Sequence, residues 1–298
     1  MLDDCLPLQT LLGDYPVTAA LRRGDIVSSS VELIFADIAR PATAFKRVVR
    51  ELAFDVAELA IMTFLIAKAH GKPLVLLPAV VLSRFQHPYL VYNAAWGARA
   101  PRDLEGKRVG IRAYSVTTVT WLRGILAEDH GVDIDRVRWV TFEAPHVAEF
   151  EDPDNVERAP PGTSAVDLLL AGELDAAVLA DASLPDPRLR RLIPEPDAAA
   201  TVWHRRHGAI QINHMVTVTS ALSRSRPDAV REVYRMLAAS RARAALRDDG
   251  GPDLNPFGYA ANRRNLEVAI DYAQRQGLLP RPLTVDELFD EVTGSLDD

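Results

Sequence analysis

A strand–turn–helix pattern in the first half of the chain carries the clearest candidate site for an anion. Residues 107–112 have the character of a short strand, and a helical pattern begins at Thr117. The first N–H groups of a helix lack partners within it and lie at the positive end of its dipole, so they favour a carboxylate or phosphate. Arg112 adds a cation, and Ser115, Thr117 and Thr118 add hydroxyls. The alternative is ordinary N-capping by Ser115 or Thr117 beside a surface arginine.

Two further side chains lie within two turns of that helix start. Trp121 and Arg123 could extend the same pocket. A tryptophan on the apolar face of a helix is also the expected result of core packing, and the local pattern leaves both interpretations open.

Glu58 and His214 are candidates for acid–base chemistry. Glu58 follows the predicted strand 54–57 and opens the apolar helix predicted over residues 58–70. Open α/β sheets bind ligands at the carboxyl ends of their strands, which favours a functional carboxylate, although the helix dipole alone explains an acidic residue there. His214 lies inside the apolar stretch 210–219, where a histidine is either catalytic or a hydrogen-bonded core residue.

The polar segment Ser83–Pro88 follows another apolar stretch, so its groups are expected at the end of a strand. Arg84 could bind an anion there. His87 could transfer a proton, because the ordinary pKa of histidine is about 6.5. The alternative is a surface loop. His204 and His207 are three residues apart but have no carboxylate or cysteine close by, so we expect no metal site.

The elements that must position these residues alternate between strand and helix along most of the chain. Strands are predicted at residues 54–57, 74–82, 89–92, 107–112, 137–142, 176–179 and 210–219. Helices are predicted at residues 58–70, 117–130, 164–171, 227–247, 259–276 and 284–292, with irregular chain at 143–162 and a loop at 185–196. The pattern indicates an α/β protein with a helical C-terminal region.

Composition excludes several classes of protein. The chain has 298 residues, of which 48% are apolar and 25% charged, which fits a globular protein of one large domain or two lobes. A formal net charge of −7 argues against nucleic-acid binding. Cys5 is the single cysteine, so no internal disulfide can form. No secretory signal and no membrane-spanning stretch are visible, which predicts a cytoplasmic protein.

Several motifs resemble those of type 2 periplasmic-binding-protein folds. Residues 103–110 (DLEGKRVG) resemble the start of the second lobe in that superfamily, and residues 166–176 (VDLLLAGELDA) resemble another of its common stretches. The similarity is greatest to the 4,5-dihydroxyphthalate decarboxylase-like branch and spans roughly residues 20–290. The segments that carry it are residues 55–59, Phe85-x-His87, Tyr114 with Thr117 and Thr118, Trp121-x-Arg123-Gly124, His214-Met215-Val216, and Pro256-Phe257-Gly258 with Asn262-Arg263.

The resemblance implies a two-lobed type 2 periplasmic-binding-protein-like fold, with a ligand cleft between the lobes and helices at the C-terminus. Residues 1–90 and 214–298 would form lobe 1, and residues 91–213 lobe 2. The chain departs from the family's Ser-Arg-x-Phe-Arg-His loop, because Gln86 precedes the histidine and an arginine stands at position 84. One cation for a substrate carboxylate is thereby moved or missing.

On this resemblance we expect a cofactor-independent decarboxylase of a small hydroxylated aromatic, phthalate-like acid. His87 or His214 would donate the proton, with Glu58 as an orienting partner or as the acceptor for a phenol. Substrate binding is expected from Arg84, Arg112, Tyr114, Ser115, Thr117, Thr118, Trp121, Arg123 and Asn262. No metal or other cofactor is expected, and no nucleic-acid partner; a homo-oligomer is possible. The alternatives are a non-catalytic small-anion solute-binding protein or sensor, and another small-acid lyase on the same scaffold.

Overall fold

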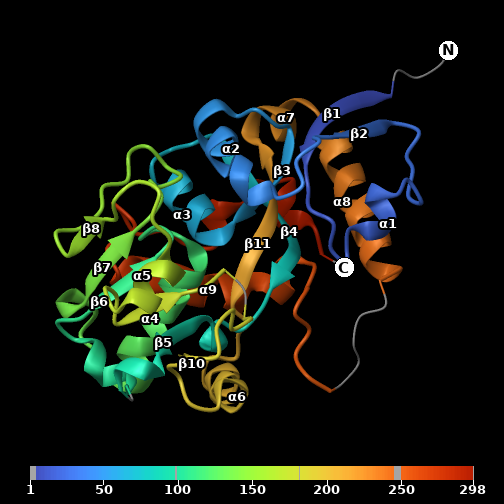
Figure 1. The fold of residues 1–298 in the computed structure, drawn as a ribbon. Coiled ribbons are helices and arrows are strands. Elements are labelled where there is room, and N and C mark those ends of the chain that lie inside the picture. Colours follow the sequence, from blue (N-terminus) through green and yellow to red (C-terminus); the bar gives the residue numbers. More distant parts are fainter. Residues whose placement is uncertain (1–4, 98, 181, 245–249, 298) are drawn as a thin grey trace. The chain divides into compact units, whose positions relative to one another are not determined.

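The computed structural model describes residues 5–97, 99–180, 182–244 and 250–297 (Figure 1). Two compact units are present: a first unit of residues 1–84 and 212–298, and a second unit of residues 85–211. The boundaries predicted from the sequence lie after residues 90 and 213. Within the described ranges, no helix is both long and apolar enough to cross a membrane.

The first unit is built on a five-stranded sheet with the order β2-β1-β3-β11-β4. Its strands are β1 (Leu6–Leu11), β2 (Val31–Phe35), β3 (Val56–Ala60), β4 (Leu74–Ser83) and β11 (Ile212–Thr219). β1 is parallel to β2 and β3, whereas β11 is antiparallel to both of its neighbours, β3 and β4. The central strand β3 and the edge strand β4 are buried along almost their whole length, as the continuous apolar sequence of β4 predicts.

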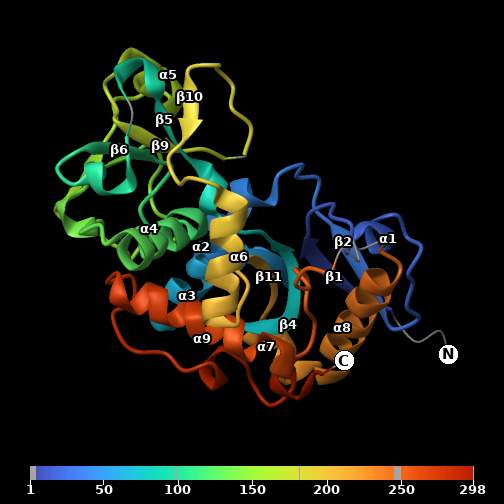
Figure 2. The same cartoon turned by 90° about the horizontal axis from the view of Figure 1, so that it is seen from below.

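Helices cover both faces of this sheet. They are α1 (Ala19–Arg22), α2 (Phe45–Glu51), α3 (Ile61–Ala69), α7 (Ser220–Ser225), α8 (Pro227–Ala242) and α9 (Tyr259–Arg275). Figures 1 and 2 show α8 and α1 on one side and α3 and α9 on the other. α8 packs because Val230, Val233 and Leu237 repeat at helical spacing and join the apolar core of the sheet.

The second unit has a six-stranded sheet with the order β10-β5-β9-β6-β7-β8. Its elements are β5 (Leu90–Asn93), β6 (Arg108–Ile111), α4 (Thr117–His130), β7 (Arg138–Thr141), β8 (Val156–Arg158), α5 (Ala165–Ala171), β9 (Ala176–Val178), β10 (Leu189–Arg191) and α6 (Pro196–His207). β9, β6, β7 and β8 are parallel, and β5 is antiparallel to β9 and β10.

Several predicted elements are confirmed within about one residue. The helix predicted over residues 117–130 is α4, which ends where Gly131 adopts a φ of +62°. A residue with a side chain rarely adopts that conformation, so the glycine marks the end of the helix in the sequence itself. The predicted helix 227–247 is α8 as far as Ala242, and residues 245–247 lie outside the described ranges.

Four predictions of local structure are wrong. The segment 143–162, predicted as irregular chain, contains β8, which pairs in parallel with β7. Glu58 does not begin a helix but lies within β3, because that strand pairs with β1 on one side and β11 on the other. Residues 284–292 contain only a short 3-10 turn at Asp286–Leu288, where the Thr284 N–H donates to the Glu287 side chain. The predicted loop 185–196 contains the strand β10, which forms by pairing with β5 although prolines lie on both sides of it. The helix α6 that follows was not predicted.

Candidate functional site

Glu58 is a fully buried carboxylate at the centre of the first unit's site. Its Oε2 atom accepts a hydrogen bond from the Gly13 N–H at 2.5 Å, and Oε1 accepts one from the Tyr15 hydroxyl at 2.7 Å. A buried charge is costly unless hydrogen bonds replace its hydration. The site supplies those bonds from a turn that lies more than forty residues earlier in the chain.

His214 supplies a third bond to the same carboxylate. It lies on β11 opposite Ala60 of β3, and its Nδ1 atom is 2.9 Å from Glu58 Oε1. An ionised carboxylate only accepts hydrogen bonds, so Nδ1 carries the proton and donates it. The side chain is 15% exposed, and the centroids of the Phe45 ring and the imidazole lie 5.1 Å apart in an edge-to-face arrangement. This geometry fixes the ring and leaves Nε2 as the nitrogen available for proton transfer.

Tyr15 is part of the site but is not among the residues predicted from the sequence. Burial, followed by the negative charge of Glu58, raises the pKa of Tyr15, while the positive charge of Arg84 lowers it. The phenol therefore stays protonated and remains a hydrogen-bond donor to Glu58. A signal was available: Gly13 and Tyr15 follow the apolar stretch Leu6–Leu12, in the way that polar residues follow a strand in a ligand-binding α/β sheet.

Strand direction brings these groups to one edge of the first sheet. β3 and β4 are both antiparallel to β11 and therefore point the same way, together with β1. The turn after β1, the residue after β4 (Arg84) and the first half of β11 consequently lie at the carboxyl edge of the sheet. Ligands of open α/β sheets bind at this edge.

The carboxyl edge of the second sheet carries different chemistry. Arg112 follows β6 and pairs with Glu143, which follows β7, at 3.1 Å. A second guanidinium nitrogen is 3.1 Å from His146 Nε2. The two charged side chains are 41% and 50% exposed, so the pair is well solvated. The predicted cation is present, but it already has an acidic partner.

The start of α4 lies beside Arg112 in the chain and supplies hydroxyls. Ser115 and Thr117 are buried, and Thr118 is partly exposed. The N-cap is Val116, without a side-chain hydrogen bond, so the alternative that Ser115 or Thr117 caps the helix is wrong. The first N–H groups of α4 keep the character of an anion-binding helix start.

Arg123 and Trp121 belong to the interior of the second unit. The guanidinium of Arg123 lies 3.5 Å from the centre of the Tyr114 ring and donates to the Tyr114 carbonyl at 2.8 Å. Burial lowers the pKa of Arg123 to about 10, which leaves it charged at neutral pH. The Trp121 ring packs against Trp203 at 5.9 Å. Both residues are fully buried, so they support Tyr114 and the core rather than present a binding surface.

His87 differs from His214 in every respect that matters for proton transfer. It lies directly before β5 and is fully buried. Among the described residues, neither of its ring nitrogens has a hydrogen-bond partner. Burial lowers its pKa to about 4, so the imidazole is neutral near pH 7. This environment disfavours the prediction that His87 is the proton donor.

Asn262 lies in the first turn of α9 and is fully buried. Its Nδ2 atom donates to the carbonyls of Pro256 and Gly258, each at 3.0 Å. These bonds hold the turn before the helix, whereas the buried Oδ1 atom of Asn262 has no hydrogen-bond partner among the described residues. In the described part of the chain, no group of three His, Cys, Asp or Glu side chains could hold a metal ion.

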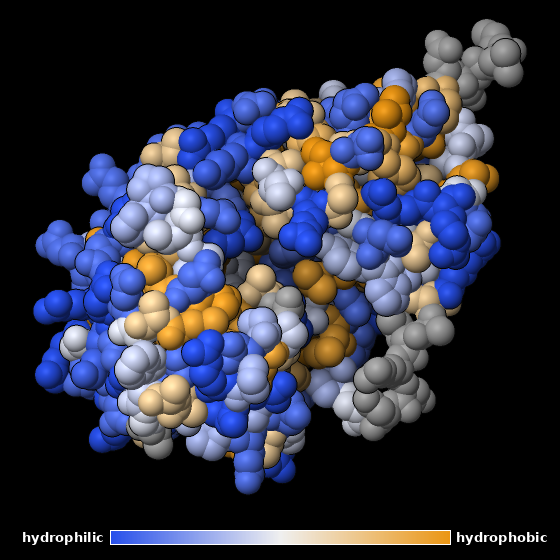
Figure 3. Space-filling view, in the orientation of Figure 1, coloured by the Kyte–Doolittle hydropathy of each residue, from blue (hydrophilic) through white to orange (hydrophobic). Residues whose placement is uncertain are grey.

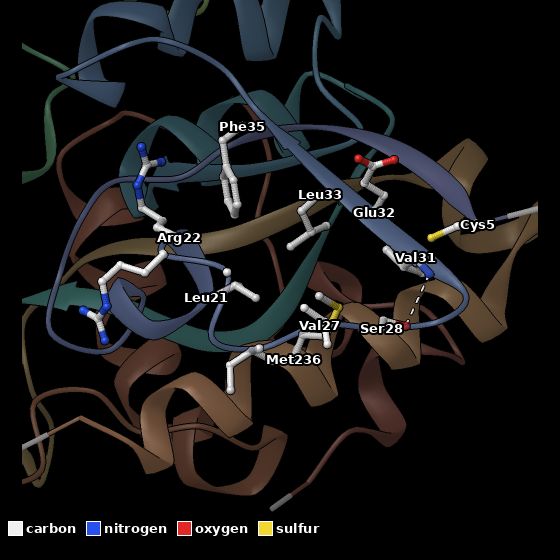
Figure 4. A pocket seen from close by; sticks show the side chains of 13 residues that line it. Cys5, Leu21, Arg22, Val27, Ser28, Val31, Glu32, Leu33, Phe35 and Met236 are labelled. Atoms are coloured by element: carbon white, nitrogen blue, oxygen red, sulfur yellow. Dashed lines mark hydrogen bonds between the residues drawn. The ribbon is translucent and has the colours of Figure 1, made fainter.

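A pocket of about 490 Å³ opens elsewhere on the first unit, between α1, β2 and α8 (Figure 4). Leu21, Leu33 and Met236 form part of its apolar wall, and Arg22 and Glu32 lie at its rim. Figure 3 shows apolar surface over the neighbouring β1–β2 edge. None of the residues around Glu58 lines this pocket, so it is separate from the candidate site.

Comparison with known proteins establishes the family. The profile of the family described as NMT1/THI5 like matches residues 37–240, which is more than half of the chain. The chain belongs to this family. Two curated relatives are 4,5-dihydroxyphthalate decarboxylases. One, from Comamonas testosteroni, is 26% identical over 95% of this chain and 96% of its own length. The other, from Pseudomonas putida, is 29% identical over 67% of this chain and 82% of its own length.

Solved structures confirm the fold. The periplasmic aliphatic sulphonate binding protein SsuA from Escherichia coli aligns with a TM-score of 0.62 and 12% identity over 95% of this chain and 97% of its own. The predicted two-lobed α/β fold of the periplasmic-binding-protein type is therefore confirmed, and the curated relatives confirm the predicted resemblance to the decarboxylase branch. A fold shared at this identity does not decide between binding and catalysis.

Proposed function

We propose that this protein is a cofactor-independent decarboxylase of small hydroxylated aromatic acids. The observation that carries the proposal is the hydrogen bond between Glu58 and His214, at the edge of the sheet where α/β proteins bind ligands. The two curated relatives, both named as decarboxylases of 4,5-dihydroxyphthalate, support the same reaction class.

In the proposed reaction, His214 is the general acid. A ring hydroxyl ortho or para to the leaving carboxylate raises the electron density on the carbon that bears it. The Nε2–H bond of the His214 imidazolium breaks as a C–H bond forms at that carbon. The C–CO₂ bond then breaks, its electron pair restores the aromatic ring, and CO₂ leaves. Neutral His214 regains a proton from water.

Glu58 has two tasks in this scheme. Its negative charge stabilises the imidazolium form of His214, and its bond to Nδ1 keeps Nε2 directed toward the substrate. Glu58 keeps these roles without contact with solvent, because Gly13 and Tyr15 supply its other hydrogen bonds.

Cations and a helix start would hold the acidic substrate. Arg84 follows β4, and its charge acts on Tyr15, beside Glu58, which makes it the proposed carboxylate clamp of the first unit. In the second unit, Arg112, Ser115, Thr117 and Thr118 form a second proposed anion-binding group. Tyr114 is left out of this group, because it is buried and its ring already packs against Arg123 and Phe150. Kinetics of variants in both units test whether both groups serve the same substrate.

The alternative is a non-catalytic protein that binds a small organic anion. The structural similarity to the sulphonate-binding protein of Escherichia coli favours it. Such a protein needs an anion site but no proton donor, and the buried Glu58–His214 pair would then have no evident purpose.

The test is to incubate the purified chain with a panel of hydroxybenzoic and hydroxyphthalic acids and to follow the release of CO₂. We expect turnover of at least one acid, and a loss of kcat of about 10²-fold or more in Glu58→Gln. His70→Gln is the matched control, because this partly exposed histidine lies just beyond the C-terminal end of α3. Binding without turnover across the panel would assign the chain to the solute-binding class.

A further inference from the structure

The turn after β1 contains the fully buried side chain of Thr18, whose hydroxyl adds to the backbone hydrogen bonds that the Tyr15 carbonyl accepts from the Thr18 and Ala19 N–H groups. Thr18 Oγ1 donates to the Gly13 carbonyl at 2.7 Å and accepts from the Tyr15 N–H at 2.9 Å. Both of its hydrogen-bonding functions are therefore used inside the turn. Within the described residues, the Thr18 hydroxyl makes no hydrogen bond to Glu58 or His214 and reaches Glu58 only through Gly13 and Tyr15.

Gly13 and Tyr15 are the residues that the turn presents to Glu58. The Gly13 N–H reaches Oε2 and the Tyr15 hydroxyl reaches Oε1. The Tyr15 ring folds back over Gly13 so closely that a Cβ atom at position 13 would lie 2.6 Å from the ring. A side chain at position 13 would therefore displace the Tyr15 ring, and with it the hydroxyl that donates to Glu58. The turn must keep both the ring and the Gly13 N–H directed at one carboxylate.

The position of these two donors affects the orientation of His214, because all three residues bind the same carboxylate. Tyr15 and His214 share the oxygen Oε1, and Gly13 occupies Oε2. With all three donors in place, the carboxylate cannot rotate without breaking a buried bond, so the Nδ1 proton of His214 has one acceptor in one position. If the turn shifts, the carboxylate is free to follow it, and the imidazole loses its fixed orientation.

We infer that Thr18 is a positioning residue, which holds the Gly13 and Tyr15 donors on Glu58 and thereby fixes the orientation and protonated nitrogen of His214. The effect of Thr18 on kcat rests on the proposed decarboxylase function, whereas its effect on the orientation of the His214 imidazole does not. Around His214 the charged and titratable groups are Glu58 on β3, Tyr15 after β1 and, acting on Tyr15, Arg84 after β4.

The test compares three variants of the full chain: Thr18→Val, which keeps the shape but removes both hydrogen bonds, Thr18→Ser, which retains the hydroxyl, and Tyr15→Phe. The first readout is the ¹⁵N–¹H spectrum of the imidazoles without substrate. We expect the Nδ1–H signal of His214 to be sharp in the wild type and in Thr18→Ser. In Thr18→Val it should weaken or shift through exchange.

The second readout is steady-state kinetics. We expect Thr18→Val to lower kcat about 10–100-fold with KM changed less than about 3-fold, because misplacement of a catalytic group by about 1 Å can have an effect of that size. Thr18→Ser should restore kcat to within about 3-fold. In Tyr15→Phe, Glu58 loses the donor that it shares with His214 on Oε1, so kcat should also fall.

The outcomes separate the two hypotheses. A His214 signal in Thr18→Val identical to that of the wild type overturns the positioning role, whatever the activity. A changed signal together with a wild type that decarboxylates no acid of the panel supports the positioning role and rejects the proposed function. If Thr18→Val fails to fold, Tyr15→Phe decides: an unchanged imidazole spectrum there overturns the inference, and a shifted one supports it.

Discussion

Both sheets end in a carboxyl edge that carries a histidine, and the two histidines have opposite surroundings. In the first unit, His214 donates to a carboxylate that is itself held by two more donors. In the second unit, the described residues offer His87 no hydrogen-bond partner, and its burial keeps it neutral. The two residues looked equally suited to proton transfer in the sequence, since both follow or occupy apolar strands.

The contrast shows what a proton donor needs beyond the right side chain. The positive charge of an imidazolium needs a nearby negative charge. A fully buried carboxylate can supply that charge only if hydrogen bonds replace its own hydration. The first edge meets both conditions. The second edge offers a neutral imidazole and a guanidinium already paired with Glu143, which suits the binding of a ligand better than the transfer of a proton.

The largest expected effect separates the two histidines directly. We expect His214→Gln to lower kcat by about 10²–10⁴-fold, because it removes the general acid. His87→Leu should lower kcat less than about 10-fold. Steady-state rates of CO₂ release for both variants, with circular dichroism as the control for folding, measure the difference. A greater loss of kcat in His87→Leu than in His214→Gln would reverse the assignment.

A second difference concerns stability at low pH. The pKa of His87 is about 4 in the folded protein, against an ordinary value of 6.5. Above about pH 6.5 both states are neutral at this site. As the pH falls from 6.5 to 4, His87 binds a proton in the unfolded chain but stays neutral in the folded protein. The free energy of unfolding therefore decreases by up to about 3 kcal/mol. Below pH 4 this contribution is constant.

Urea unfolding of the wild type and His87→Leu at pH 7.5 and pH 4.5 measures this effect. Other groups titrate in both proteins, so the difference between them isolates His87. We expect the wild type to lose about 2–3 kcal/mol more than the variant between the two pH values. Equal losses would show that His87 is accessible to protons in the folded state.

Local patterns in the sequence predict the elements of the fold well where the chain carries its own signals. α4 begins and ends at the predicted residues because its apolar face repeats at helical spacing and Gly131 ends it. β3 shows the limit. Its sequence Val-Ala-Glu-Leu-Ala contains good helix formers, and only the pairing with β1 and β11, which comes from distant parts of the chain, makes it a strand.

The sequence allowed the residues of the candidate site to be predicted, but not the hydrogen bonds between them. Glu58 and His214 could be singled out because each is polar within an apolar stretch. The bond between them joins residues 156 positions apart, and the bonds from Gly13 and Tyr15 to Glu58 span 45 and 43 positions. Helical and strand periodicity extends over a few residues and cannot indicate contacts between residues so far apart in the sequence. The same limit explains Arg112, whose partner Glu143 lies after the next strand and therefore could not be inferred locally.

The smallest expected effect tests the second edge alone. Because the Arg112–Glu143 pair is about half exposed, it contributes at most about 1 kcal/mol. Glu143→Gln should free the guanidinium and tighten the binding of a hydroxybenzoic acid about 2–5-fold in calorimetric titration, with a smaller effect at high salt. Glu157→Gln is the matched control, since its exposed pair with Arg108 lies at the other end of β6. Equal affinity in Glu143→Gln and the control would show that Arg112 takes no part in binding, and would leave the hydroxyls and N–H groups at the start of α4 as the anion-binding groups of this edge.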